Sequence, residues 1–248
     1  MAIVQALHEQ GLKIDWAKMP TYNTVMSLAA GAGLLLVVWF GFTLLRGRPV
    51  VAEGWALAFA ANGLILFATG LHMTLTWPLA GQGFSFDNII FGEPSLVFGV
   101  LMLAAAVFLW RRGAALSVTD GTATEIAHGE RLRYLVRLSA PISVLVVGIG
   151  LACFGIAAAG WRYTLFAAPP EEPISGHFAD HPMLEASFIS TLYVLVGIGA
   201  ILFPLALRSP HSPLTLVIGV CWTLAGLAFL LFGALNYFTH IGLIVNTQ

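Results

Sequence analysis

Six stretches of this chain are almost wholly apolar, and each is long enough to cross a lipid bilayer. They lie at about residues 22–45, 54–76, 93–110, 139–161, 184–207 and 214–238. A helix rises about 1.5 Å per residue and the hydrocarbon core is about 30 Å thick, so roughly 18 to 25 apolar residues span it. Hydrophobic residues make up 58% of the chain and charged residues 9%, whereas about a quarter of residues in soluble domains are charged. The sequence therefore predicts an all-α integral membrane protein, with one domain of six transmembrane helices over residues 1–248.

Charge and cysteine content exclude several classes of protein. The formal net charge is −1, without the clustered basic face that nucleic-acid binding requires. Cys153 and Cys221 both fall inside apolar runs, where a thiol is a small packing residue, so neither a disulfide framework nor a cysteine metal motif is expected. The first 20 residues lack the basic start and apolar run of a cleavable signal, so we expect the first span to stay in the membrane.

The basic residues alternate along the chain in a way that predicts its orientation. Loops after the first, third and fifth spans hold eight of the 11 basic residues: Arg46, Arg48, Arg111, Arg112, Arg131, Arg133, Arg137 and Arg208. The positive-inside rule puts these loops in the cytoplasm. Both termini, the segment 1–21 and the loops at 77–92 and 162–183 are then outside. The cytoplasmic loop 111–138 is mixed in charge and predicts an amphipathic surface helix.

Two distant segments share the same polar pattern, which suggests an internal repeat. Phe86-Asn88-Glu93-Ser95 and Phe178-Asp180-Glu185-Ser187 match, and "GLHMTL" at 70–75 matches "GWRYTL" at 160–165. The sequence thus predicts that residues 54–110 and 139–207 are two copies with the same orientation, related by an axis along the membrane normal. We expect these four spans to form a four-helix core, with the first and last spans packed around it.

The repeated motif also suggests a site. Glu93 and Glu185 fall where two spans begin on the outer side, and histidines gather on that same side, although ionisable residues are costly in membranes. Imidazole with carboxylate suits Zn, Cu, Fe or Mn, so a divalent transition metal is the predicted cofactor, with haem b as the weaker alternative. The predicted ligands are His72, Glu93, His181, Glu185 and His240; residues predicted to orient them are Asn88, Asp180, His177, Arg162 and Asn236.

Structural interpretations of the same residues stay open. A carboxylate in the first turn of a helix is favoured by the helix dipole, and Asn88 or Asp180 can cap a helix. The sequence therefore leaves three function classes. One is a metal-binding subunit of a membrane redox or oxygenase system, which could be an enzyme; another is a small-solute or proton-coupled transporter; the third is a structural or assembly subunit. Expected partners are the bilayer, other membrane subunits or a second copy of the chain.

The segment "IDWAKMPTYNTVMSLAAG", followed by five more spans, resembles a bacterial and archaeal family of polytopic membrane proteins of unassigned function. The resemblance covers the N-terminal segment and the Glu-bearing outer motifs. It implies a prokaryotic plasma membrane and supplies no chemistry to carry over.

Overall fold

The computed structural model describes residues 23–76, 86–113 and 125–247, and the predicted outer segment 1–21 lies outside this part. The described chain is helical and without strands. Its elements are α2 (Asn23–Leu45), α3 (Ala52–Leu75), the π-helix η2 (Asn88–Gly92), α4 (Glu93–Arg112), α5 (Glu125–Ser139), α6 (Ser143–Tyr163), the 3₁₀-helix η4 (Ser175–Phe178), α7 (Pro182–Arg208) and α8 (Pro213–Thr247).

The six predicted spans are confirmed. Among the described residues, α2, α3, η2 with α4, α6, α7 and α8 are long and apolar enough to cross a membrane. The chain is therefore a multi-pass membrane protein that lies in a lipid bilayer. The amphipathic helix predicted in the loop 111–138 is present as α5. At 35 residues α8 is about 52 Å long, which is longer than a hydrocarbon core about 30 Å thick requires.

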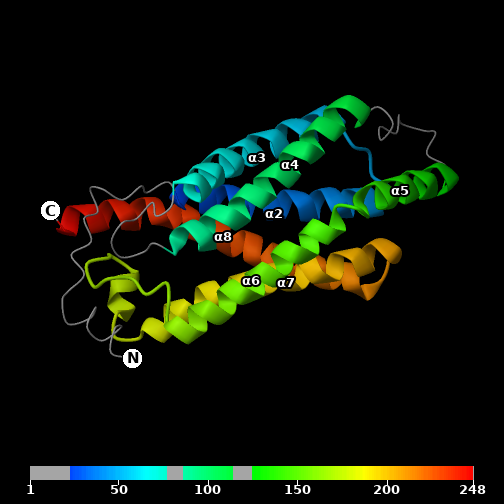
Figure 1. Ribbon diagram of the computed structural model, residues 1–248. Helices are drawn as coiled ribbons and strands as arrows, with labels where there is room; N and C mark the ends of the chain where they lie inside the picture. Colours follow the sequence, from blue (N-terminus) through cyan, green and yellow to red (C-terminus); the bar gives the residue numbers. More distant parts are fainter. Residues whose placement is uncertain (1–22, 77–85, 114–124, 248) are drawn as a thin grey trace.

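The helices pack as three antiparallel pairs. α3 lies along α4, α6 along α7, and α2 along α8, with the α2–α8 pair in the middle (Figure 1). α2 also contacts α3, and α8 also contacts α7, so the central pair joins the outer two. We call the end where α8 ends and α4 and α7 begin the C-terminal end. The opposite end, where Arg46, Arg112 and Arg208 lie, is the arginine end.

Small residues bring the two helices of each pair close together. A Cβ on Gly70 would meet the backbone nitrogen of Leu96 at 2.5 Å, which joins α3 to α4. A Cβ on Gly31 would likewise meet the backbone nitrogen of Leu230 at 2.3 Å, joining α2 to α8. Lipid chains are as apolar as the side chains, so close van der Waals packing holds such helices together rather than exclusion of water.

The arrangement differs from the predicted four-helix core. α4 and α6 touch only briefly, and α2 and α8 fill the centre that the repeat assigned to spans two to five. The close packing within α3–α4 and within α6–α7 is in keeping with a duplication, because Gly70 and Gly160 each meet the partner helix near the C-terminal end. The internal repeat itself stays a prediction.

Candidate functional site

A long cavity lies between the two halves of the bundle, one built around the α3–α4 pair and the other around the α6–α7 pair. Its volume is about 760 Å³, and its walls come mainly from α2, α4, α5, α6, α7 and α8. Along α2 the lining runs from Met26 to Leu45, which at about 1.5 Å per residue is about 28 Å. The cavity therefore extends through most of the membrane thickness.

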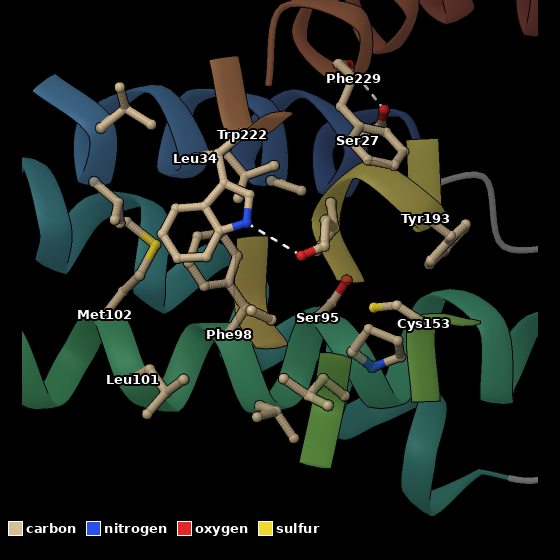
Figure 2. A pocket seen from close by; sticks show the side chains of 18 of the residues that line it. Ser27, Leu34, Ser95, Phe98, Leu101, Met102, Cys153, Tyr193, Trp222 and Phe229 are labelled. Carbon is tan, nitrogen blue, oxygen red and sulfur yellow. Dashed lines mark hydrogen bonds between the residues drawn. The ribbon is translucent and has the colours of Figure 1, made fainter. Parts of the chain in front are cut away.

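The wall of this cavity is apolar over most of its length. Figure 2 shows Leu34, Phe98 and Met102 around the indole of Trp222, whose Nε1–H donates to the Val196 carbonyl at 3.1 Å. The few polar side chains of the middle section include Ser27, which donates to the Phe229 carbonyl at 2.9 Å. A molecule inside the cavity would thus meet mainly hydrocarbon.

Polar side chains gather at the C-terminal end of the cavity. They come from the start of η2, from the segment between α6 and α7, from the first turn of α7 and from the last third of α8. The lining residues of this polar end are Asp87, Glu172, Ser175, Glu185, Asn236, Thr239 and His240.

Two polar atoms of α8 at this end lack partners. The Thr239 side chain is 3% exposed and lines the cavity, yet its hydroxyl has no hydrogen-bond partner within the described structure. The Nδ1 atom of His240 is also buried and has no hydrogen-bond partner within the described structure. Buried polar groups are nearly always hydrogen-bonded, so such atoms beside a cavity indicate a missing partner.

Glu172 organises the segment that covers the polar end. The residue is 8% exposed, and its carboxylate accepts from the backbone N–H groups of Ile174 at 2.9 Å, Gly176 at 3.2 Å and Ser175. It also lies close enough for its charge to act on the ring of His240. Glu172 thus holds the start of η4 in place next to α8.

The segment between α6 and α7 also contacts the C-terminal end of α8. Asn246 donates to the Glu171 carbonyl at 2.8 Å, and a Cβ on Gly242 would meet Cγ of Pro173 at 2.3 Å. The segment starts at a turn in which Thr164 and Phe166 have φ angles of 52° and 72°. Left-handed backbone at non-glycine residues costs about 1–3 kcal/mol each. Here it turns the chain so that Phe166 lines the cavity and packs on Phe91.

Glu185 has a structural contact as well as a place in the cavity wall. It lies in the first turn of α7, where a carboxylate suits the helix dipole, and its Oε2 accepts from the backbone N–H of Ala168. The structural interpretation of Glu185 is therefore supported. Glu185 also lines the cavity, so its charge acts on a molecule bound there.

Asp87 is the most perturbed acid at the polar end. It precedes η2 and is partly buried, and this burial raises the pKa of its carboxyl to about 7 from the usual 3.8. Desolvation disfavours the charged form. Asp87 can therefore hold or lose a proton near neutral pH, depending on what is beside it.

The remaining predicted site residues do not line the cavity. Six of them are exposed: His72, Glu93, Arg162, His177, Asp180 and His181. Arg162 lies over the ring of Tyr163, and Asn88 is buried and donates to the Met73 carbonyl. Of the predicted set, the structure brings Glu185, His240 and Asn236 to one cavity. Among the described side chains no three of His, Cys, Asp and Glu lie close enough to hold a metal ion.

Sequence reasoning missed Asp87 and Glu172. Asp87 stands between two residues of the repeated motif, and Glu172 lies in the acidic, proline-flanked stretch "PPEEP" at 169–173. The sequence shows both residues as acids next to apolar spans. It does not show that they line a cavity, because that depends on how the segment after α6 folds back.

A second, smaller groove of about 520 Å³ lies between α4 and α6. Phe86, Pro94 and Ile149 border both this groove and the cavity, and exposed Glu93 stands at the rim of the groove. The two helices α4 and α6 make few contacts with each other.

Comparison with curated proteins and with solved structures finds no match. A family described as "Protein of unknown function (DUF981)" matches residues 19–242, which includes all six spans. That match agrees with the resemblance noted from the sequence, since it names a family of unassigned function. The chain belongs to the DUF981 family.

Proposed function

We propose that this protein binds a single-chain amphiphile in the cavity between its halves, with the chain along the bundle and the head at the polar end. The observation that carries the proposal is the cavity itself, apolar along its length and polar at one end. Its volume falls within the range of about 300–1,000 Å³ of small-molecule sites.

An empty cavity of this size is energetically unfavourable. Its wall is mainly apolar, and side chains that face an unfilled space lose the van der Waals contacts that a bound chain would supply. Water is a poor filling, because apolar cavities stay dry. An apolar molecule from the bilayer therefore fills the space.

The length of the cavity suits an extended hydrocarbon chain. Its lining runs for about 28 Å along α2, and the wall along that length is mainly apolar. The unpartnered hydroxyl of Thr239 then supplies a hydrogen bond for the head.

The site that we propose keeps one part of the sequence prediction, a group of carboxylates and a histidine at the extracytoplasmic face. Glu185 and His240 remain in it, joined by Asp87 and Glu172. A metal-linked redox role and a transport role stay predictions, and no geometry of the described residues favours either over binding.

Native mass spectrometry of the full-length protein with an added long-chain alcohol tests this proposal. Gly41 lines the cavity, and a Cβ there meets no atom within 4 Å, so Gly41→Phe fills the space near the arginine end. Gly148 on α6 also has open space and lines neither the cavity nor the smaller groove, so Gly148→Phe is the matched control.

We expect one alcohol per protein, with affinity reduced at least about tenfold in Gly41→Phe and unchanged in Gly148→Phe. An alcohol too short to reach Gly41 should bind both variants equally. Absence of saturable binding, or equal loss in both variants, contradicts the proposal.

A further inference from the structure

We propose that the head of the bound amphiphile is cationic, so that the ligand class is a long-chain amine. This inference rests on the proposed function, since it names the ligand of the same cavity. It comes from the charges that line the polar end and from the unpartnered hydroxyl next to them.

The lining of the cavity contains acidic residues and, in the described part of the chain, no lysine or arginine. Asp87, Glu172 and Glu185 contribute three carboxyl groups at the polar end, and in the part of the chain that is described no lysine or arginine lines the cavity. Arg162, a nearby basic residue, is exposed and lies over Tyr163. Clefts lined by one sign of charge concentrate molecules of the opposite sign.

Backbone contacts hold two of these acids in place without a basic side chain. The Glu172 carboxylate is held by three backbone N–H groups, and Glu185 accepts from one. Backbone donors stabilise a negative charge without a basic side chain. The described acids lie too far apart to coordinate one metal ion together. They therefore attract a cationic head through their combined electrostatic field.

The Thr239 hydroxyl distinguishes a ligand site from a merely acidic patch. It is buried, lines the cavity and has no partner in the described structure. An ammonium head carries three donors and can donate to this oxygen while it faces the carboxylates. A phosphate or carboxylate head would meet carboxyl groups of the same sign of charge, which makes its binding less favourable.

The experiment compares three probes of one chain length on the full-length protein in nanodiscs: the primary amine, the alcohol and the carboxylic acid. We expect the amine to bind at least about tenfold more tightly than the acid, with the alcohol between them. Asp87→Asn and Thr239→Val should each weaken amine binding about fivefold or more. Asp180→Asn, an exposed acid outside the cavity, should leave it unchanged.

The outcomes separate the two proposals. If the acid binds as tightly as the amine, or if Asp87→Asn leaves the preference for amine over alcohol unchanged, the cationic head is wrong while the cavity proposal stands. If none of the three probes binds, the proposed function itself fails. Retained alcohol binding in Asp87→Asn shows that the variant is folded.

Discussion

The hydroxyl of Tyr193 donates to the carbonyl of Ile90 at 2.7 Å and joins α7 to the π-helix before α4. Both residues are buried, at 6% and 4% exposure. A π-helix shifts the backbone register, and such segments occur often at functional sites. The hydrogen bond therefore connects the two halves of the bundle beside the polar end of the cavity.

Removal of this hydroxyl tests the connection. Tyr193→Phe keeps the ring and loses the donor, so we expect a loss of about 0.5–1.5 kcal/mol in the free energy of unfolding. Tyr237→Phe is the control, because Tyr237 is exposed on α8. Unfolding in a mixed detergent series measures both. Equal stability of Tyr193→Phe and the wild type would show that the bond has no role in holding the halves together.

Glu172 should matter for the order of the segment between α6 and α7. Glu172→Ala removes the acceptor of three backbone N–H groups, and hydrogen bonds to a charged group contribute about 1.5–3 kcal/mol. We expect faster proteolytic cleavage within residues 164–181. Glu171→Ala serves as the control, since Asn246 contacts only its backbone carbonyl. The role assigned to Glu172 is wrong if both variants are cleaved at the wild-type rate.

Asp87 gives the ligand-free protein a characteristic pH dependence. Burial raises its pKa in the folded state to about 7, whereas the unfolded chain titrates near 3.8. Between these values the folded state keeps a proton that the unfolded state releases, so stability falls as pH rises from about 4 to about 7. Each pKa unit corresponds to about 1.4 kcal/mol, and the cost is complete above pH 7.

Asp87→Asn abolishes this contribution. Its thermal stability should match the wild type near pH 3, below the pKa of the unfolded chain, and exceed it at pH 8, with the difference growing between the two. Glu93→Gln, an exposed acid on the same side of the bundle, is the control. A stability difference that is the same at every pH would mean that the Asp87 carboxyl has an ordinary pKa.

The predicted metal centre has a direct test of its own. Because no three potential ligands lie together among the described residues, we expect chelation to leave both thermal stability and alcohol binding unchanged. Metal content should also be the same in the wild type, in Glu93→Gln and in His181→Ala. A stoichiometric metal that is lost in both variants would restore the metal site predicted from the sequence.

The membrane architecture was predictable because it depends on lengths of apolar sequence alone. The predicted span at 22–45 and α2 at Asn23–Leu45 agree closely, as do the others. The exception is α8, which continues past the predicted end at residue 238 to Thr247 and includes Thr239 and His240. Polar residues at 236, 239 and 240 obscured the helical continuation, since a hydropathy pattern ends where polarity begins.

The site was only partly predictable, because it depends on which helices are neighbours. The repeat predicted a four-helix core of spans two to five and so placed Glu93 and Glu185 in one site. In the structure α2 and α8 occupy the centre, which leaves Glu93 at an outer groove and Glu185 at the cavity. Helix order in a bundle follows from close packing at residues such as Gly31 and Gly99, and that packing has no signature at the level of single spans.

The central claim is that one apolar chain lies along the cavity with its head at the polar end, and photo-crosslinking tests it most directly. The probe is a long-chain alcohol with a diazirine at the chain terminus, reacted with the full-length protein and mapped by mass spectrometry. We predict adducts near Leu45, Leu109 and Leu207 at the arginine end of the cavity, prevented by excess unmodified alcohol. Adducts confined to lipid-facing residues such as Val144 and Leu151, and unaffected by that alcohol, would contradict the claim.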